Sequence, residues 1–358
     1  MIKRDITIGI VGCGRVAQHY RHIFESGAVD NFQIVACCDS DLKKAQKLSK
    51  PLKSNAFQDM ELMLDTAKPD LVIILTPSGD HFAHARLALE KNHHVLVEKP
   101  ICLIPEQALE LEDIARKRNL MLGVAFQNRF NPSVQHLNAA MQEGRFGRRV
   151  TASIRLRWCR QQNYYEDGWH GTWQQDGGVI NQQAIHHVDC INWLCGPIEA
   201  VCAEESNRLN QLEAEDTLVA ILRFADGSLG TIEATTAARP EDFEASLSLV
   251  GEKGMAQIGG IALNKIDTWA FVEPRKEDAE VPARYSQTVS NGYGVGHGAL
   301  LSKTIERLRR GSSEAPISTS DGLGAVRLVH ALYASIERGG WVRLDEHPIS
   351  NRLGKPQE

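Results

Sequence analysis

The chain has 358 residues, of which 24% are charged and 42% hydrophobic, and its formal net charge is -5 at pH 7. This composition is typical of a soluble globular protein, and the length suits two domains of about 100–200 residues each. The slightly acidic charge gives no sign of the concentrated basic face that nucleic-acid binding requires, so we expect no nucleic-acid partner. No apolar run approaches the roughly 20 residues that cross a bilayer, and the chain leads straight into its first strand, so we expect neither a membrane span nor a signal peptide.

The chain contains eight cysteines. They form no Cys-x-x-Cys pair, and Cys37 and Cys38 are adjacent inside an apolar run. This usage is typical of reduced thiols in an intracellular protein rather than of a disulfide framework. We therefore expect a cytoplasmic protein.

The first apolar run is followed by the residue order that a dinucleotide site needs. It ends in Gly12-x-Gly14-x-x-Ala17, and a helical pattern follows. The first glycine allows a tight turn, the second lets a diphosphate approach the backbone, and the small third residue lets the helix pack on the strand. The helix N-terminus, at Arg15 and Val16, offers N–H groups and a partial positive charge to the phosphates.

A second apolar run ends in Asp39, about where an acidic residue meets the adenosine ribose in such sites. The carboxylate would accept hydrogen bonds from the ribose hydroxyls and repel a 2′-phosphate, which favours NAD over NADP. The alternative is that Asp39 only caps the next helix, which we expect over residues 42–49.

Strands and helices then alternate up to Val124. We expect a strand at 55–57, a helix over 60–66 capped by Asp59, a strand at 71–75, a helix over 82–91, a strand at 94–97, a helix over 105–118 and a strand at 120–124. This alternation implies parallel crossovers and a doubly wound Rossmann sheet, the α/β domain that we assign to residues 1–125. Ligands of such sheets bind beyond the carboxyl ends of the strands. The residues expected at that edge, besides Gly12 and Asp39, are Thr76, Pro77, His81, Glu98 and Lys99.

From residue 126 the pattern changes to antiparallel hairpins. Period-two alternation occurs at 150–158, 217–224, 228–235 and 245–250, and helices are expected over 132–143, 179–194, 297–310 and 321–338. We assign residues 126–358 to an α+β domain built on a large open, mostly antiparallel sheet, with a loose tail over 350–358. An open sheet face suits another subunit, so we expect a homo-oligomer.

Lys99 is the first candidate for chemistry. It follows a buried strand, lies between Glu98 and Pro100, and belongs beside the expected nicotinamide. Burial near a cofactor would lower its pKa and let it act as a proton donor or relay. The alternative is an ordinary surface lysine at the end of a strand.

The second candidate is the helix expected over 179–194. On a helix, Gln182, His186 and Asp189 share one face because they are spaced by four and three residues. A histidine near its ordinary pKa can take a hydroxyl proton as hydride leaves, whereas we interpret His187 as structural. Two histidines and an aspartate also suggest a metal site, but glutamine is a poor ligand, so we expect no metal.

A polar and aromatic loop precedes that helix. Its candidate residues are Arg160, Tyr164, Tyr165, Trp169 and Thr172. Such side chains suit a uracil ring, sugar hydroxyls and a diphosphate, where arginine provides a bidentate clamp. Interface packing explains the same residues equally well.

Taken together, the motifs resemble those of the Gfo/Idh/MocA oxidoreductases along nearly the whole chain. The matching residues are Gly12-x-Gly14-x-x-Ala17, Thr76-Pro77-x-x-x-His81, Glu98-Lys99-Pro100 and Gly177-Gly178…His186-x-x-Asp189. Within that family, segments between residues 76 and 260 are similar to the UDP-N-acetyl-2-amino-2-deoxyglucuronate dehydrogenases of bacterial surface-polysaccharide synthesis. Among those segments is Gln127-Asn128-Arg129.

The resemblance implies a function and a role for individual residues. Lys99 would hydrogen-bond the reacting hydroxyl, His186 would be the general base, and Gln127 would join the cofactor site. NAD⁺ would take hydride from carbon 3 of UDP-N-acetylglucosaminuronate and give a 3-keto nucleotide sugar. The resemblance also implies a homotetramer in which 2-oxoglutarate regenerates NAD⁺ from bound NADH.

Two residues depart from the subgroup, and three alternatives stay open. Gln182, which would orient the sugar, stands where the subgroup has asparagine and the wider family aspartate; His170 replaces a basic residue after the loop tryptophan. The same chemistry could serve UDP-N-acetylglucosamine, or a free sugar or cyclitol. The alternative of another class is a non-catalytic NAD-binding redox sensor, against which the paired Lys99 and His186 argue.

Overall fold

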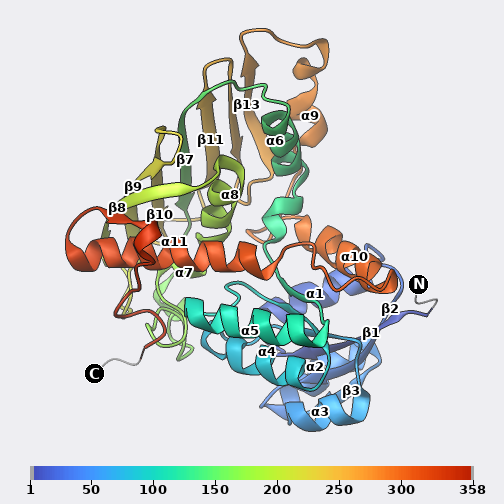
Figure 1. Ribbon diagram of the computed structural model, residues 1–358. Helices are drawn as coiled ribbons and strands as arrows, with labels where there is room; N and C mark the ends of the chain where they lie inside the picture. Colours follow the sequence, from blue (N-terminus) through green and yellow to red (C-terminus); the bar gives the residue numbers. More distant parts are fainter. Residues whose placement is uncertain (1–3, 356–358) are drawn as a thin grey trace. The chain divides into compact units, whose positions relative to one another are not determined.

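The computed structural model describes residues 4–355, and the chain divides into two compact units (Figure 1). The first unit runs to Phe126 and includes His297–Leu323; the second comprises Gln127–Gly296 and the chain from Gly324 on. The expected ranges 1–125 and 126–358 miss this return of residues 297–323 to the first unit. The return follows from helix α10 (Gly296–Arg309), which buries Leu301, Ile305 and Leu308 in the core of the first unit.

The first unit contains a six-stranded sheet with the order β3-β2-β1-β4-β5-β6. All neighbouring strands are parallel. This is the strand order of a doubly wound dinucleotide-binding sheet, and it confirms the predicted Rossmann fold. The strands are β1 (Ile6–Val11), β2 (Phe32–Cys38), β3 (Asn55–Phe57), β4 (Leu71–Ile74), β5 (His94–Val97) and β6 (Leu122–Val124).

Local signals in the sequence mark where several helices of the first unit begin. Asp41 and Asp59 cap α2 and α3 by accepting hydrogen bonds from the N–H groups of Lys43 and Leu62. Helices α1 and α2 pack together, as do α4 and α5. The helices are α1 (Arg15–Glu25), α2 (Leu42–Leu52), α3 (Met60–Ala67), α4 (His81–Glu90) and α5 (Pro105–Arg118). Across residues 4–355, no helix is both long and apolar enough to span a membrane.

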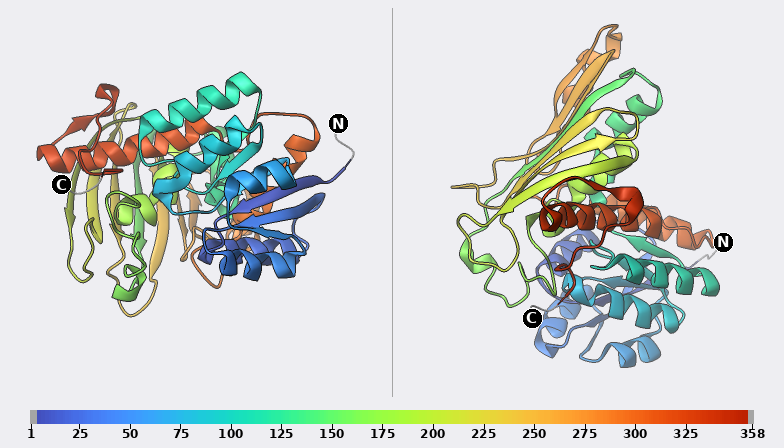
Figure 2. Two further views of the ribbon diagram at one scale, coloured as in Figure 1. Left: turned by 90° about the horizontal axis from the view of Figure 1, so that it is seen from below. Right: turned by 60° about the vertical axis from the view of Figure 1, so that its left-hand side comes forward.

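The second unit is built on an eight-stranded sheet with the order β13-β12-β11-β7-β10-β9-β8-β14 (Figure 2). Only β7 and β10 pair in parallel, which confirms the predicted mostly antiparallel sheet. The sequence pattern did not predict β8, β12, β13 or β14. The strands are β7 (Arg149–Arg157), β8 (Ile198–Ser206), β9 (Thr217–Phe224), β10 (Leu229–Thr235), β11 (Glu244–Gly251), β12 (Gly254–Gly259), β13 (Lys265–Phe271) and β14 (Val342–Arg343).

Helices cover one face of this sheet, where α6 (Pro132–Gln142) packs on β12 and α8 (Ile185–Cys195) packs on β7 and β11. The other face carries exposed apolar side chains. On β9, Leu218, Ala220 and Leu222 are buried, whereas Val219 and Ile221 are 51% and 47% exposed. The strand alternation therefore leaves one side of the sheet open within this chain. Two further helices belong to this half, α9 (Val281–Tyr285) and α11 (Thr319–Arg338), whose first turn still lies in the first unit.

The single helix expected over 179–194 is wrong. The structure has α7 (Val179–Gln182) and then α8. Between them, the Ala184 N–H donates to the carbonyl of Val179, five residues back, and the His187 N–H donates to the carbonyl of Ala184, three residues back. The regular α-helical spacing of four residues is therefore interrupted here. Gln182 and His186 therefore lie on different helices and not on one continuous helical face, although His186 and Asp189 both lie on α8.

The loose tail expected over 350–358 is also wrong for residues 350–354; residues 356–358 lie outside the described part. Ser350 and Leu353 are buried. Arg352 forms ion pairs with Glu205 at 2.6 Å and with Glu337 at 3.3 Å. The polar composition of the segment hides this packing, because the partners of Arg352 are distant in the sequence.

Candidate active site

The turn after β1 needs a glycine at Gly12 and leaves open space at Gly14. Gly12 has a φ of +90°, and a Cβ there would lie 2.6 Å from the carbonyl carbon of Leu75. A Cβ at Gly14 would meet nothing within 4 Å. Arg15 and Val16 open α1, and its first turn has no capping side chain from the described residues. An open backbone at an uncapped helix N-terminus fits a diphosphate.

Asp39 links the end of β2 to this turn. Its Oδ2 accepts the Cys13 N–H at 2.8 Å, and its Oδ1 accepts the Asp41 N–H at 2.9 Å. Each carboxylate oxygen has a second lone pair, so Asp39 can still accept hydrogen bonds from ribose hydroxyls. Since Asp41 provides the cap of α2, capping alone does not explain Asp39. The first unit therefore fits the adenosine diphosphate of NAD.

Thr76, Pro77 and His81 lie where β4 leads into α4. The ring nitrogens of His81 lie 2.6 Å from the Pro100 carbonyl oxygen and 2.9 Å from that of Thr76, and burial lowers its pKa. The Thr76 hydroxyl contacts Nδ1 of His84 at 3.1 Å, and Pro77 starts the short turn of residues 78–80. Carbonyl oxygens only accept and the neutral ring has a single N–H, so His81 donates to one of these two oxygens and lies against the other, between the segments that follow β4 and β5.

Glu98 is buried beside Lys99, which is only partly buried. The Tyr20 hydroxyl donates to Glu98 Oε1 at 2.9 Å, and the Lys99 N–H donates to Glu98 Oε2 at 3.1 Å. His297 Nε2 lies 3.5 Å from Oε1. Burial, with the Glu98 charge beside it, raises the pKa of Tyr20 well above its ordinary value, so this phenol stays a donor. Glu98 therefore fixes the backbone from which Lys99 projects.

The remaining predicted residues belong to the second unit. Gln127 is buried, and its Nε2 lies 3.5 Å from the Tyr293 carbonyl oxygen. His186 is 8% exposed on α8. One turn later, Asp189 forms a buried bidentate pair with Arg129, at 2.6 and 2.7 Å. This pair anchors the helix that carries His186.

His187 differs from its neighbour. It is 1% exposed, and neither of its ring nitrogens has a hydrogen-bond partner among the described residues. Burial lowers its pKa to about 4. A buried imidazole held neutral in this way fits the structural role expected for it.

The loop residues gather in one cluster. The Tyr164 ring lies 5.7 Å from the Arg160 guanidinium and 5.1 Å from the Tyr165 ring. The ring centroids of Trp169 and His170 lie 3.6 Å apart, with the rings tilted by 33°, and those of His170 and Tyr164 lie 4.3 Å apart. We name these residues with Thr172, whose hydroxyl donates to the Trp169 carbonyl, the loop cluster.

Parts of the loop cluster are tied to the protein itself. Arg160 forms an ion pair with Asp242 at 2.9 Å, and His170 Nδ1 lies 2.6 Å from Asp167. The Tyr165 hydroxyl bonds to Thr236 at 2.7 Å, and burial raises its pKa to about 12. These contacts order the cluster and leave Arg160 with further N–H donors.

Sequence reasoning missed the residues that hold the start of α7. Glu215 accepts the Ile180 N–H at 3.0 Å and the Tyr333 hydroxyl at 3.1 Å, and the same hydroxyl accepts the Gly178 N–H at 3.0 Å. A Cβ at Gly178 would overlap the Glu215 carboxyl group, which explains that glycine. No local pattern signals these contacts, because Tyr333 and Glu215 are 118 residues apart.

Gln182 was expected to orient a sugar, and its amide contacts Asp176. Gln182 Nε2 donates to Asp176 Oδ1 at 2.6 Å, and Asp176 Oδ2 accepts the Gly171 N–H at 3.0 Å. Asp176 thereby connects α7 to the loop cluster. The sequence marks Asp176 only as the residue before the Gly177-Gly178 pair.

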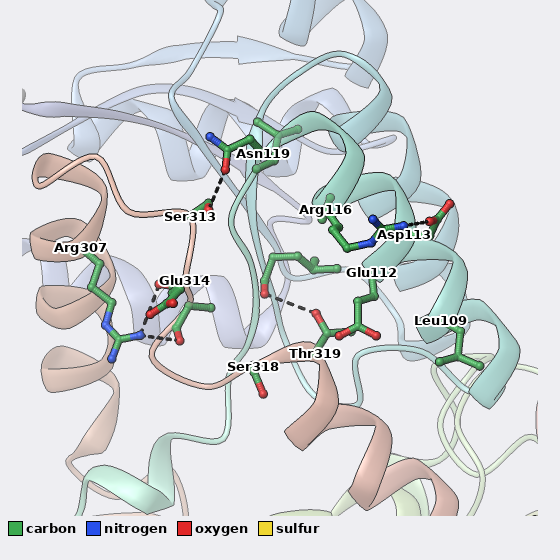
Figure 3. Close-up of a pocket in the computed structure, with 14 residues that line it drawn as sticks. Leu109, Glu112, Asp113, Arg116, Asn119, Arg307, Ser313, Glu314, Ser318 and Thr319 are labelled. Carbon is green, nitrogen blue, oxygen red and sulfur yellow. Dashed lines mark hydrogen bonds and ion pairs between the residues drawn. The ribbon is translucent and has the colours of Figure 1, made fainter.

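A surface cavity of about 600 Å³ lies elsewhere in the first unit, between α5 and the segment 307–319 (Figure 3). Its lining includes Leu120 and Leu122, at the start of β6, and it contains none of the predicted site residues. Polar groups on its rim pair with one another, as Asn119 does with Ser313. Cofactors of parallel sheets bind at the opposite, carboxyl ends of the strands, so this cavity is not the cofactor site.

Comparisons with known proteins cover both units. The model of an oxidoreductase family with an NAD-binding Rossmann fold matches residues 6–126, and that of the GFO/IDH/MocA C-terminal domain matches residues 134–257. The WlbA dehydrogenase of Bordetella pertussis, solved with NADH and UDP-GlcNAcA, is 32% identical, with 96% of this chain and 99% of that chain covered and a TM-score of 0.89. The Chromobacterium violaceum WlbA dehydrogenase, solved with the same ligands, is 34% identical, with 96% and 97% covered and a TM-score of 0.88. The D-glucoside 3-dehydrogenase of Escherichia coli K12 is 28% identical over 281 residues, 72% of this chain and 78% of that protein.

Proposed function

The chain belongs to the Gfo/Idh/MocA oxidoreductase family, and we propose that it oxidises carbon 3 of UDP-N-acetylglucosaminuronate to the 3-keto sugar. At the coarser level it is an NAD-dependent sugar dehydrogenase acting on a CH–OH group. The observation that carries the proposal is the similarity, over 96% of this chain, to dehydrogenases solved with NADH and UDP-GlcNAcA. The E. coli relative is named for dehydrogenation at carbon 3 of glucosides, which supports the same position.

The chemistry is divided between two side chains. Bound NAD⁺ supplies the hydride acceptor. Lys99 donates a hydrogen bond to the reacting hydroxyl, and His186 takes the proton of that hydroxyl as the base. The anchored backbone beside Glu98 and the anchored helix before Asp189 support these roles, because a proton-transfer group must be held in one orientation.

The loop cluster supplies recognition of the nucleotide sugar. Tyr164, Tyr165 and Trp169 offer aromatic surface to a uracil ring, and Arg160 offers charged N–H donors to the diphosphate. Thr172 and Gln182 contact the sugar. A free sugar or cyclitol has no uracil ring or diphosphate for this ordered cluster to recognise. A non-catalytic redox sensor would not need Lys99 and His186 as a hydrogen-bond donor and a base.

The setting of the reaction is part of the proposal. We place it in the cytoplasm, in surface-polysaccharide biosynthesis, with 2-oxoglutarate as the oxidant that recycles bound NADH. Eight free thiols fit a reducing compartment. We further propose a homotetramer, supported by the exposed apolar side chains of Val219, Ile221 and Leu229 on the open sheet face.

The test is NADH absorbance after mixing the purified enzyme with NAD⁺ and UDP-N-acetylglucosaminuronate, UDP-N-acetylglucosamine, free sugars or inositol, with and without 2-oxoglutarate. We expect that, of these compounds, only UDP-N-acetylglucosaminuronate gives NADH. Multiple turnovers should occur only when 2-oxoglutarate is present. NADH formation from UDP-N-acetylglucosamine instead would change the assigned substrate to that nucleotide sugar. An enzyme inactive with every compound would favour the sensor.

A matched pair of lysine variants tests the assignment of the catalytic group. Lys99→Met should lower kcat by about 100-fold or more and keep its affinity for NADH, measured by fluorescence titration. Lys91→Met, which removes a lysine that pairs with Glu61 and Asp65 on the surface, should leave both quantities unchanged. Normal turnover by Lys99→Met would contradict the role.

A further inference from the structure

Asp176 fixes the orientation of the Gln182 amide. Gln182 Nε2 lies 2.6 Å from Asp176 Oδ1, and the two side chains belong to residues that are 7% and 1% exposed. A carboxylate has no hydrogen to give, so only the NH₂ end of the amide can face it. The carbonyl oxygen of Gln182 must then point away from Asp176.

The reversed amide is strongly disfavoured. It would bring the Gln182 carbonyl oxygen against a carboxylate oxygen and lose a charge-assisted hydrogen bond, the stronger kind. In a buried place, water cannot compensate for that loss. The amide therefore has a fixed polarity and can offer only an acceptor on its other side.

The position of Asp176 is itself fixed by the loop cluster. Its Oδ2 accepts the Gly171 N–H at 3.0 Å, and its own N–H donates to the Thr172 carbonyl at 3.0 Å. On the other side, Asn181 Nδ2 donates to the Asp176 carbonyl at 2.5 Å. Asp176 thus connects the loop cluster to α7 and holds the Gln182 amide from the side of the loop.

We propose that Asp176 is a positioning and specificity-determining residue, which holds Gln182 as an acceptor for a hydrogen-bond donor of the sugar. In the substrate of the proposed function, on which this inference rests, the donors next to carbon 3 are the acetamido N–H and the 4-hydroxyl group. Asp176 does not contact the sugar. Its effect is to exclude the amide orientation that would present NH₂ to these donors.

Reversing the polarity of the pair tests this role. Gln182→Glu places two carboxylates face to face and should raise KM for the nucleotide sugar by about 30-fold or more, as expected for a lost hydrogen bond plus repulsion. Asp176→Asn lets the amide adopt either orientation and should raise KM by about 10-fold with a smaller change in kcat. The double variant Asp176→Asn with Gln182→Glu restores the bond in reverse, with an acceptor still facing the sugar, and should recover KM to within about 3-fold of the original value.

Controls separate positioning from folding. Asp226→Asn makes the same chemical change at a hairpin turn, where Asp226 pairs with Arg149 at 2.8 Å, and should leave KM and kcat unchanged. Thermal unfolding and NADH affinity are measured for every variant. If Asp176→Asn does not fold, Gln182→Leu, which removes the amide and keeps its volume, replaces it and should raise KM similarly.

The outcomes distinguish this inference from the proposed function. A wild-type enzyme inactive with UDP-N-acetylglucosaminuronate overturns the proposed function, and the inference with it. An active wild type whose folded Asp176→Asn or Gln182→Leu variant keeps its KM overturns only the inference. A double variant no better than Gln182→Glu overturns it as well, because a polarity effect must be reversible.

Discussion

The Asp39 carboxylate accepts the backbone N–H of Cys13 at 2.8 Å, so the residue that follows β2 also shapes the glycine turn after β1. The group proposed to select the ribose thus also orders the turn proposed to hold the diphosphate. In this proposal, cofactor choice and loop geometry depend on one side chain.

Asp39→Ala is therefore expected to loosen the preference for NAD. Removing the carboxylate removes the ribose acceptor and the repulsion of a 2′-phosphate, so the ratio of kcat/KM for NAD to that for NADP should fall by about 10-fold or more. Asp41→Ala removes a helix cap at the neighbouring position and should lower thermal stability without changing the ratio. An unchanged ratio in Asp39→Ala would mean that Asp39 only supports the turn.

Alanine substitutions of the two glycines of the turn should affect different properties, stability for Gly12 and NAD affinity for Gly14. In Gly12→Ala the new Cβ would lie 2.6 Å from backbone at Leu75 with φ at +90°, so we expect a loss of stability. In Gly14→Ala the Cβ enters open space, so the protein should unfold at an unchanged temperature and bind NAD more weakly. Calorimetry and NADH titration on both variants check this. Equal NAD affinity in Gly14→Ala and the wild type would contradict the diphosphate site.

Glu215 should make the stability of the folded protein depend on pH. Burial, and next the Glu205 charge, raise its pKa from 4.5 to about 8. A carboxyl whose pKa is raised on folding stabilises the native state below the unfolded pKa, and this stabilisation is lost as pH rises through the folded pKa. The stability of Glu215→Gln relative to the wild type should thus increase between pH 4.5 and 8, by up to a few kcal/mol. Glu204→Gln, on the exposed side of β8, is the control, and a pH-independent difference in Glu215→Gln would contradict the shift.

The adjacent histidines should separate activity from stability. His186→Leu should lower kcat by about 100-fold or more, because the proposed base is removed. His187→Leu replaces an imidazole without hydrogen-bond partners among the described residues and should keep activity. The pKa of His187 falls from 6.5 to about 4 on burial, so the wild type loses stability as pH falls through this range and His187→Leu should not. Loss of activity in a folded His187→Leu variant would contradict its structural role.

The fold of the first unit could be predicted because its signals are local. The continuous apolar run of β5 and the proline that opens α5 fixed both elements at the residues observed, His94–Val97 and Pro105–Arg118. The return of α10 to this unit could not be predicted, because Leu301, Ile305 and Leu308 show only that the helix has an apolar face. They do not show which core receives it.

Motifs in the sequence could name candidate site residues but not their contacts. Motifs indicated Gly12, Asp39 and Gln182, and their roles toward cofactor and sugar stay predictions. The helix break after Gln182 could not be predicted, because no glycine or proline follows Gln182 there. Likewise, the link between Gln182 and Asp176 depends on a turn whose shape comes from tertiary hydrogen bonds.

The proposed hydride transfer from carbon 3 of the sugar to NAD⁺ can be measured directly. The enzyme is incubated with NAD⁺ and UDP-N-acetylglucosaminuronate carrying deuterium at carbon 3, and the reduced cofactor is examined by mass spectrometry and NMR. We expect deuterium at the nicotinamide carbon 4 of the reduced cofactor, together with a 3-keto sugar. Unlabelled NADH would show that hydride leaves another carbon, and the absence of any reduced cofactor would contradict oxidation of this substrate.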